Sequence, residues 1–334
     1  MSKRIVIDFL VYVVVRTLIC VVQSLSIDTC AWFARRLAWL FCDVLKIRGK
    51  VVHANLAMVF PGKSDAERRR IARGMWEHLF IMVCEIAQTP RKIHDSNWRR
   101  YVAMKGKPEI VRQLLDERPV VVVSGHFGNF DAGCYLIGLL GFPTYTVARR
   151  LDNPFLDRYL RAFREAKGQY IIEKEGSAPL IASILERRGK ILLLGDQHAG
   201  PKGCWVDFLG HPASCHKAVA LFTLMSRAPM LVVSNRRAGE PLAFQVTFEG
   251  VADPETLPPG LASVKALTRW YNQCLETAVL EEPEQYWWLH RRWRDPPPRR
   301  QSTAKGEPTV TAPVASSPAS DQRHDSHESS REAA

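Results

Sequence analysis

Two side chains that could share one proton-transfer task lie five residues apart in residues 119–133, PVVVVSGHFGNFDAG. They are His126 and Asp131, which follow a run of valines and precede an apolar segment. A carboxylate bonded to one imidazole nitrogen fixes the tautomer and leaves the other nitrogen free to accept a proton. The pair could therefore act as a general base toward a hydroxyl group.

The spacing of His126 and Asp131 requires a turn between them. On one continuous helix their side chains would point about 140° apart, and on a strand they would point to opposite faces. Gly125 and Gly128, with Asn129, give the backbone freedom to turn. Asp131 then falls in the first turn of the next helix, where the helix dipole favours its charge. The alternative is that His126 merely ends a strand and Asp131 merely caps a helix.

Strands and helices alternate around this turn. The valine run at 120–123 predicts a buried strand, and 132–140 predicts an apolar helix. Further strands are expected at 143–149, 170–172, 190–194, 230–234 and 244–248, with helices at 151–168, 178–188 and 261–280. The alternation predicts an α/β fold with a mainly parallel sheet flanked by helices. Ligands of such a sheet gather at the carboxyl ends of its strands.

Polar residues follow three of the predicted strands. His126 follows the valine run, Arg149 follows the next strand, and Asp196 with Gln197 follows ILLLG. Because parallel strands end at one edge of the sheet, we expect these side chains to converge there. For Asp196 and Gln197 the sequence leaves two roles open, which are substrate contact and a hydrogen-bonded strand end.

Composition limits the classes of partner. The chain has 334 residues, a net charge of +12 and a pI near 9.5, so an anionic partner is expected: nucleic acid, a negatively charged membrane, or an acidic substrate or carrier. Its eight cysteines include no C-x-x-C pair, which favours reduced thiols on the cytosolic side of a membrane. Motifs for zinc proteases, P-loop or Rossmann nucleotide binding and serine hydrolases are absent from the sequence.

A cluster of possible metal ligands occurs at residues 204–216, CWVDFLGHPASCH. The spacing of His211, Cys215 and His216 matches no familiar zinc pattern, so no metal is predicted. Pro212 and Ser214 instead suggest a loop that leads into a helix.

The amino-terminal 45 residues differ from the rest of the chain. Residues 9–27 are strongly apolar and about as long as the roughly 20 residues that a bilayer span needs, although Arg16 and Gln23 interrupt them. Residues 31–45 mix aromatic and basic side chains, as interfacial helices do. We therefore predict a membrane anchor at 1–45, either a tilted span or an in-plane helix pair. The alternative is a pair of ordinary core helices.

The rest of the chain divides into a folded domain, expected at 46–295, and a polar tail rich in Pro and Ser at 296–334 that is expected to be disordered. Ser64 and Glu67 form a predicted capping box for a long amphipathic helix. The basic cluster that follows at 68–73 could face anionic headgroups or simply solvent.

With these motifs in place, the chain resembles the bacterial lipid A late acyltransferases, the lauroyl and myristoyl transferases of the lysophospholipid acyltransferase superfamily. The resemblance covers roughly the first 295 residues. It rests on GHFGNFD as an H-x-x-x-x-D/E motif, on R-x-x-x-N at Arg149 and Asn153, on the DQ pair followed by VDFLGHPAS, and on PEQYWWLHRRW. Asp131 departs from this branch, which usually has Glu at that position.

The resemblance implies a glycerolipid acyltransferase-like fold and a mechanism. His126, oriented by Asp131, would deprotonate an acceptor hydroxyl as it attacks the thioester of an acyl carrier protein or coenzyme A. No cofactor, metal or covalent enzyme intermediate is expected. The candidate substrate contacts are Asn129, Arg149, Asn153, Arg164, Asp196 and Gln197, of which the arginines would hold anionic acceptor groups or the developing oxyanion.

The expected partners follow from the same resemblance. They are a thioester donor, an anionic glycolipid such as a lipid A precursor, and the cytoplasmic face of the inner membrane. A lysophospholipid acceptor is the alternative for the reaction. A nucleic-acid binder would not explain the apolar amino terminus or the His126–Asp131 turn, and a catalytically idle, basic membrane scaffold is the remaining non-enzymatic alternative.

Overall fold

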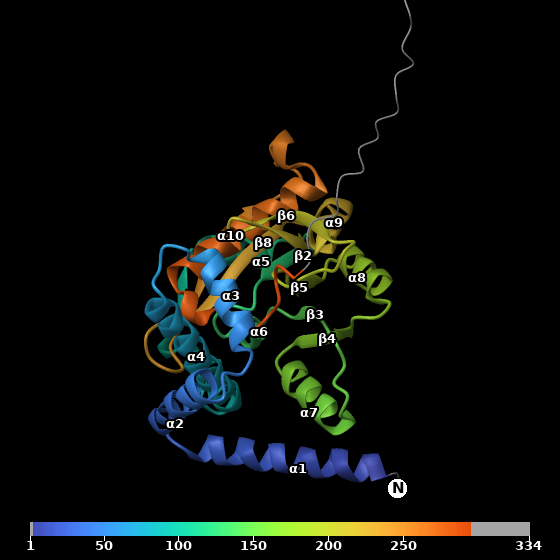
Figure 1. The fold of residues 1–334 in the computed structure, drawn as a ribbon. Helices are drawn as coiled ribbons and strands as arrows, with labels where there is room; N and C mark the ends of the chain where they lie inside the picture. The colour runs from blue at the N-terminus through green and yellow to red at the C-terminus, as the bar shows by residue number, and fades with distance from the viewer. Residues whose placement is uncertain (1–2, 295–334) are drawn as a thin grey trace, which may run out of the picture. The chain divides into compact units, whose positions relative to one another are not determined.

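The computed structural model describes residues 3–294 (Figure 1). The predicted tail at 296–334 lies outside the described residues. The helices are α1 (Lys3–Ser24), α2 (Ile27–Trp39), α3 (Gly49–Val59), α4 (Asp65–Lys92), α5 (Lys107–Leu115), α6 (Phe130–Leu139), α7 (Pro154–Glu165), α8 (Ser177–Glu186), α9 (Lys217–Ser226) and α10 (Val264–Glu281). The strands are β1 (Val102–Lys105), β2 (Val120–Ser124), β3 (Thr144–Ala148), β4 (Gln169–Glu173), β5 (Lys190–Leu194), β6 (Cys204–Phe208), β7 (His211–Cys215), β8 (Met230–Arg237) and β9 (Phe244–Ala252).

A seven-stranded sheet in the order β1-β9-β8-β2-β5-β3-β4 forms the centre of the domain. The strands from β8 to β4 are all parallel, whereas β9 pairs antiparallel with β8 and parallel with β1. The predicted α/β fold with a mainly parallel sheet is confirmed. The carboxyl ends of β2, β5 and β3 therefore lie along one edge of the sheet.

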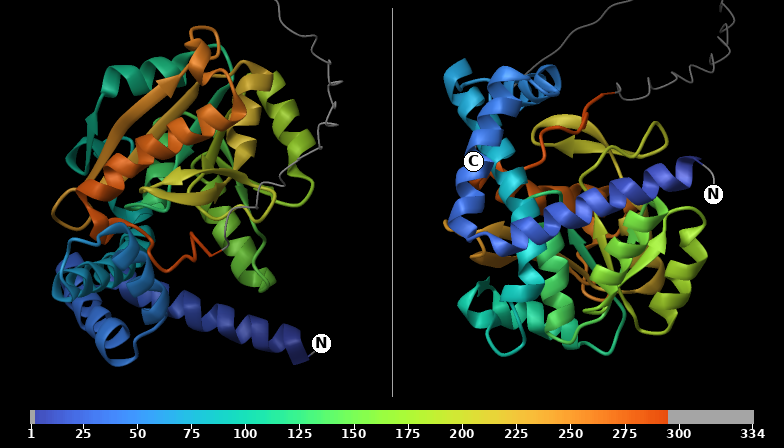
Figure 2. Two further views of the ribbon diagram at one scale, coloured as in Figure 1. Left: turned by 45° about the horizontal axis from the view of Figure 1, so that its top comes forward. Right: turned by 90° about the horizontal axis from the view of Figure 1, so that it is seen from below.

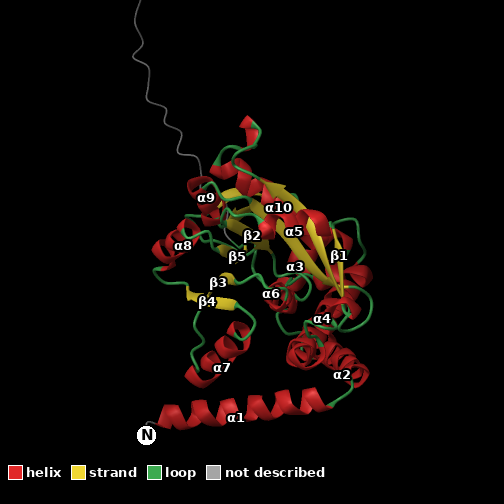
Figure 3. Ribbon diagram, turned by 180° about the vertical axis from the view of Figure 1, so that it is seen from behind, coloured by secondary structure: helices red, strands yellow, loops and turns green. Residues whose placement is uncertain are grey.

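The hydrophobic core lies on both faces of this sheet, which helices cover (Figures 2 and 3). All four valines of β2 are fully buried because the strand is central and alternate side chains face opposite layers. Val121 and Val123 join the cluster that includes side chains of α8, α9 and α10, and Val120 and Val122 join the cluster that includes α5 and α6. This double burial fixes where β2 ends, and so where the turn after it begins.

Residues 204–215 form the antiparallel hairpin β6–β7 and not the loop that the sequence suggested. Leu209 and Gly210 connect the strands with φ values of 52° and 79°, the two positive angles that a type I′ turn requires. Only then does α9 begin, with His216 at its N-cap. Pro212 does not prevent the pairing because the sheet has just two strands, and a proline is tolerated at an edge.

The amino-terminal helices pack on the domain instead of forming a separate unit. The described residues 3–294 fall in one compact unit, which includes the helices of the predicted anchor at 1–45. α2 packs against α4, and α1 runs across the underside of the domain toward α7 (Figure 2, right). Asn153 donates to the carbonyl oxygen of Asp8 (2.8 Å), and the ring of Tyr12 contacts Phe155 and Tyr159.

One side of α1 faces the protein. Its half-buried side chains recur with helical spacing: Asp8, Tyr12, Val15, Arg16, Ile19, Val22 and Gln23. The guanidinium of Arg16 stacks on Tyr159 (4.2 Å to the ring centroid), and Gln23 donates to the carbonyl oxygen of Ala87. The opposite side carries the most exposed aliphatic residues: Ile7 (59%), Leu10 (57%), Val14 (59%), Leu18 (58%) and Val21 (48%).

The long helix α4 begins with the predicted capping box of Ser64 and Glu67. Part of its basic cluster is bound within the protein, because Arg69 and Arg73 donate to the two oxygens of Asp43 (2.7 and 2.8 Å). Asp43 follows α2, so these ion pairs tie the amino-terminal helices to α4 and leave fewer basic groups for headgroups or solvent.

Candidate active site

The register of the sheet brings His126 to Asp196. Ser124 at the end of β2 pairs with Leu194 at the end of β5, and each of the two polar residues lies two positions further along its chain. Asp196 accepts a hydrogen bond from Nδ1 of His126 through Oδ1 (2.8 Å) and one from its backbone N–H through Oδ2 (2.9 Å). Both carboxylate oxygens therefore hold one residue, which fixes the imidazole at its ring and at its backbone.

Gly125 makes this approach possible. A Cβ at this position would lie 3.3 Å from Cγ of Asp196, tighter than nine in ten real Cβ contacts, so the carboxylate would have to shift. The absence of a side chain lets β5 deliver its carboxylate beside the turn. Within the segment GHFGN, this glycine therefore serves close packing against Asp196, while Gly128 supplies the left-handed backbone (φ 58°).

The environment sets the charge states of the pair. Burial alone would lower the pKa of His126, but the charge and hydrogen bond of Asp196, aided by the charge of Asp131, raise it above its ordinary value. Burial would raise the pKa of Asp196, which is 2% exposed, yet His126 and the buried Arg292 lower it. Asp196 is therefore ionised, and Nδ1 of His126 carries a proton that leaves Nε2 as the basic nitrogen.

Two aromatic rings fix the orientation of the imidazole. Phe130 and Trp287 contact it edge-on, with centroid distances of 5.1 and 5.6 Å, and the backbone N–H of Trp287 donates to the carbonyl oxygen of His126 (3.1 Å). Sequence reasoning did not assign these residues to the site. The signal was present, since Phe130 lies inside GHFGNFD and Trp287 inside PEQYWWLHRRW, but nothing in the sequence showed that the two segments meet.

Gln197 lies beside the ring nitrogen of His126 that Asp196 does not bind. Its Nε2 lies 3.0 Å from Nε2 of His126 and donates to it, because Nδ1 already carries the imidazole proton. An acceptor hydroxyl that reaches Nε2 must therefore displace or share this amide. The sequence left substrate contact and a hydrogen-bonded strand end open for Gln197, and in the structure its amide lies against Nε2 of His126.

Asp131 does not bond His126, which corrects the expected pairing. Its Oδ1 accepts two hydrogen bonds from Arg164 of α7, at 2.6 and 3.1 Å. The reason is local: Asn129 is the N-cap of α6, so Asp131 lies in the first helical turn and points toward α7, while Asp196 occupies Nδ1. Asp131 acts on His126 through its charge alone. Arg164, an expected substrate contact, is held by this carboxylate.

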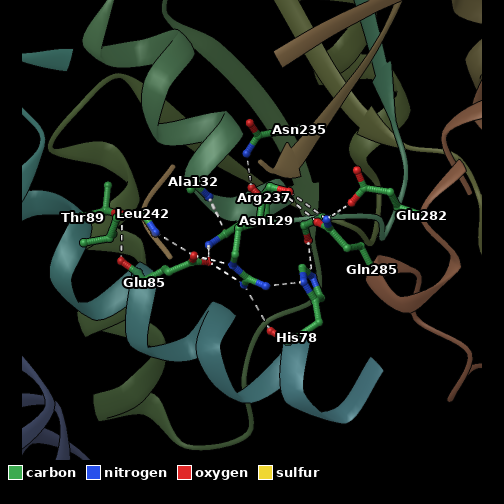
Figure 4. A network of polar contacts seen from close by, with 11 residues as sticks. His78, Glu85, Thr89, Asn129, Ala132, Asn235, Arg237, Leu242, Glu282 and Gln285 are labelled. Atoms are coloured by element: carbon green, nitrogen blue, oxygen red, sulfur yellow. Dashed lines mark hydrogen bonds and ion pairs between the residues drawn. The ribbon is translucent and has the colours of Figure 1, made fainter. Parts of the chain in front are cut away.

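The expected substrate contact at Asn129 is also corrected, because this residue is fully buried and its side chain is already hydrogen-bonded within the protein (Figure 4). Its Oδ1 caps α6 by accepting from the N–H of Ala132 (3.0 Å), and its Nδ2 donates to Glu85 (2.9 Å). No substrate can reach it without unfolding the turn. Asn129 shapes the site from within the protein.

The region after β3 differs from the expectation as well. β3 ends at Ala148, so Arg149, expected at the end of this strand, belongs with Arg150 to the loop that follows it. Arg149 is 83% exposed, with a distant contact to Asp152 (3.8 Å). Arg150 is 64% exposed and lines a cavity of about 530 Å³ between this loop and the first residues of α1.

Asn153, another expected substrate contact, caps α7. Its Oδ1 accepts from the N–H groups of Phe155 and Leu156, and its Nδ2 binds the carbonyl oxygen of Asp8. Both ends of the amide are thus used to begin α7 and to hold α1. The R-x-x-x-N motif therefore has a structural explanation at its asparagine.

The arrangement offers a general base at a sheet edge and basic groups nearby. Within residues 3–294, no group of three or more His, Cys, Asp and Glu side chains is arranged to hold a metal ion. The assembled residues can orient a neutral imidazole, move a proton from a hydroxyl to Nε2, and stabilise the resulting imidazolium beside Asp196.

Comparisons with known proteins identify the family. The family model described as bacterial lipid A biosynthesis acyltransferase matches residues 2–295. The chain is 25% identical over 260 residues to the lipid A biosynthesis lauroyltransferase of Escherichia coli (strain K12), an alignment that covers 76% of this chain and 81% of the relative. It is 23% identical over 258 residues to the lipid A biosynthesis palmitoleoyltransferase of the same strain, with the same coverage of 76% and 81%.

A crystal structure of the 1-acyl-sn-glycerophosphate acyltransferase from Thermotoga maritima also aligns with the chain. The alignment covers 78% of this chain and 99% of that protein, with 14% identity and a TM-score of 0.37.

Proposed function

The chain belongs to the bacterial lipid A biosynthesis acyltransferase family and is an acyltransferase, and we propose that it moves a fatty acyl chain from a thioester donor to a hydroxyl of a lipid A precursor, with His126 as general base. The observation that carries the mechanism is the 2.8 Å contact between Nδ1 of His126 and Oδ1 of Asp196. It leaves Nε2 as a base at the edge of the sheet where ligands of parallel sheets bind.

The reaction needs one base and no covalent enzyme intermediate. Nε2 of His126 takes the proton of the acceptor hydroxyl as its oxygen attacks the thioester carbonyl. The new ester C–O bond forms, the C–S bond breaks, and the imidazolium returns the proton to the leaving thiolate. Asp196 remains ionised and stabilises the imidazolium, as a buried carboxylate does in hydrolase triads. Gln197 yields Nε2 to the acceptor and keeps an amide donor beside the reacting carbonyl.

Basic residues of α7 and the loop before it supply the electrostatic part of the proposal. Arg164, fixed by Asp131, lies on α7, and Arg149 and Arg150 lie in the loop that leads into that helix. A phosphorylated acceptor needs cationic partners, and the cavity that Arg150 lines can admit such a group. We assign the acceptor headgroup to this side of the site.

The amino-terminal helices support membrane association. Within residues 3–294, α1 is the one helix long and apolar enough to cross a bilayer. Arg16 and Gln23, which interrupt its apolar run, however, contact α7 and α4, and its most exposed side chains are aliphatic. Arginine at the centre of a spanning helix costs roughly 2.5–3.5 kcal/mol on insertion scales. An in-plane position on one leaflet keeps Arg16 against Tyr159 and out of lipid, so we favour this orientation over a span.

The donor is proposed to be an acyl carrier protein or coenzyme A thioester, approaching from the cytoplasmic side of the inner membrane. The net charge of +12 suits an acidic carrier, the phosphates of coenzyme A and an anionic membrane surface. These anionic partners make electrostatic steering effective and predict that turnover falls as salt rises.

Lipid mass spectrometry tests the proposal most directly. Cells that lack this gene should lose one acyl group from lipid A, and expression of the intact chain should restore it, whereas the His126→Ala variant should not. Loss of an acyl group from phospholipid with lipid A unchanged would assign the acceptor to the lysophospholipid class. Unchanged lipids of both kinds would contradict the proposed reaction.

A further inference from the structure

Behind the His126 turn lies a buried ion pair that the proposed reaction does not use. Glu85 of α4 is fully buried, and Arg237 at the end of β8 is 9% exposed. The guanidinium binds both carboxylate oxygens, with Nε at 2.6 Å from Oε1 and Nη2 at 2.8 Å from Oε2. A buried pair of this kind rarely adds stability over apolar packing, because desolvation cancels much of its attraction. We therefore look for its role in the other hydrogen bonds that Glu85 and Arg237 make.

Two chains of hydrogen bonds connect the ion pair to the turn that follows His126 (Figure 4). On one route, Oε2 of Glu85 accepts from Nδ2 of Asn129, whose Oδ1 caps α6. On the other, Nη1 of Arg237 lies 2.9 Å from Nδ1 of His78, whose Nε2 lies 3.2 Å from the carbonyl oxygen of Gly128. The pair therefore holds two consecutive residues of the turn, two and three positions after His126.

The tautomer of His78 follows from its partners. Arginine can only donate, so Nδ1 of His78 accepts, and its Nε2 carries the proton that it donates to Gly128. Burial, with the nearby charge of Arg237, lowers the pKa of His78 to about 3, so the ring stays neutral at working pH. The connection from Arg237 to the turn is thus fixed in direction and does not titrate near neutrality.

β8 completes the support. The N–H of Asn129 donates to the carbonyl oxygen of Asn235 (2.9 Å), and Nδ2 of Asn235 donates back to the carbonyl oxygen of Asn129 (2.6 Å). The backbone is so close that a Cβ at Gly128 would lie 1.9 Å from the oxygen of Asn235. The turn has no room to shift toward β8, and the ion pair prevents it from moving away.

We propose that Glu85 and Arg237 are positioning residues that hold the turn so that His126 meets Asp196 in the geometry needed for proton transfer. This inference rests on the proposed function, since it assigns a role toward the same base. The two residues touch no reacting atom. They act through Asn129, His78 and Gly128, and their loss should loosen His126 without removing any group that binds substrate.

Arg237→Lys tests the proposal, because an ammonium keeps the charge but cannot bind Glu85 and His78 at once. Its matched control is Arg118→Lys. Arg118 also grips a carboxylate with two nitrogens, at 3.0 and 2.7 Å from Asp253, but it lies just before β2, at the end of that strand away from His126. Both variants lose a bidentate ion pair, but only the pair of Arg237 is connected to the turn after His126.

Steady-state kinetics with lauroyl-acyl carrier protein and a purified lipid A precursor should separate the two. For Arg237→Lys we expect kcat to fall about 10- to 100-fold with KM nearly unchanged, since a displacement near 1 Å can cost 10²-fold. The acid limb of its pH–rate profile should also move to lower pH, because a weaker contact with Asp196 lowers the pKa of His126. Arg118→Lys should lose melting temperature while keeping kcat and its pH limb.

A second pair of variants covers the case in which Arg237→Lys does not fold. His78→Gln can still accept at one end and donate to Gly128 at the other, whereas His78→Leu fills the space without hydrogen bonds. We expect Gln to retain most of kcat and Leu to lose about 10-fold or more. Equal turnover of these two, or equal small losses with unshifted pH limbs in Arg237→Lys and Arg118→Lys, would overturn the proposal. A wild-type enzyme without turnover would instead contradict the proposed function.

Discussion

Two aspartates lie near His126, and the protein uses them differently. Asp196, from the end of β5, is buried and holds the ring and the backbone of the histidine through its two oxygens. Asp131, from the first turn of α6, bonds Arg164 and reaches His126 only through its charge. The partner of the imidazole is thus 70 residues away in sequence, and the carboxylate of the five-residue motif organises the neighbouring helix.

The difference follows from which contacts each position can make. The parallel register of β2 and β5 aligns the two strand ends, so residues two positions beyond them face each other. Asp131, in the first turn of α6, instead faces α7 and accepts hydrogen bonds from Arg164. The H-x-x-x-x-D spacing therefore indicates a strand–turn–helix unit and does not by itself indicate a hydrogen bond between its ends.

The largest expected effect is that of His126→Ala, which removes the imidazole whose pKa both aspartates raise. General-base catalysis is typically worth about 10² to 10⁴ in rate, and we expect a loss in this range with the fold intact. Turnover measured beside circular dichroism checks it. A variant with near wild-type turnover would remove His126 from the mechanism and make the comparison of its partners irrelevant.

Asp196→Asn should come next, with a loss of about 10² to 10⁴ in kcat, because an amide no longer stabilises the imidazolium and can favour the wrong tautomer. KM should change little, since Asp196 is too buried to bind substrate. Initial rates at saturating acceptor measure the effect. A rate within a factor of a few of wild type would show that the 2.8 Å contact does not serve catalysis.

Asp131→Asn should be milder than Asp196→Asn, with a loss on the order of 10-fold, because it removes a charge near His126 and frees Arg164 without breaking a bond to the imidazole. We also expect a higher KM for the acceptor if Arg164 is displaced. Acceptor titrations at fixed donor separate the two contributions. A loss larger than that of Asp196→Asn would reverse the order of the two carboxylates.

The pH dependence of kcat/KM should also distinguish Asp196 from Asp131. The proposed base works when neutral, so kcat/KM should fall as pH drops below the raised pKa of His126. Without Asp196 the burial effect dominates and the acid limb should move clearly to lower pH, whereas Asp131→Asn should move it only slightly. For stability the sign is opposite: the raised pKa stabilises the fold below the ordinary value of 6.5, and this contribution disappears as pH rises through the folded-state pKa.

The smallest effects are expected at the two loop arginines on the acceptor side. Arg150 lines the cavity beside α1 and Arg149 projects into solvent, so Arg150→Gln should raise the acceptor KM a few-fold and Arg149→Gln less. Kinetics on both variants under identical salt check the order. Equal and negligible changes would move the acceptor headgroup away from this loop and leave Arg164 as its cationic partner.

Much of the fold could be predicted because its signals are local. The valine run, the strand–helix alternation and the Ser64–Glu67 box each depend on residues close in sequence, and the sheet and capping box were confirmed. The loop predicted at 204–216 was wrong, because a hairpin forms there whose turn places Leu209 at positive φ, which no turn rule favours.

The site was only partly predictable for a different reason. The turn, His126 and the strand-end residues followed from spacing, but hydrogen-bond partners depend on tertiary register. Asp196, Trp287 and the Glu85–Arg237 pair come from segments 70, 161, 41 and 111 residues from His126, and no local pattern states that they meet. Asn129 was misjudged because a polar residue in a glycine-rich turn looks exposed until its cap and its buried partner are known.

The most direct test of the account is a double-mutant cycle that pairs each aspartate variant with His126→Ala. If Asp196 acts only through His126, the double variant Asp196→Asn with His126→Ala should be no slower than His126→Ala alone. Asp131→Asn should still lower the residual rate of His126→Ala, because the Asp131–Arg164 ion pair is intact in His126→Ala and the second substitution removes it. The opposite pattern, in which Asp131 is silent without His126 and Asp196 is not, would contradict the assignment of Asp196 as the partner of the base.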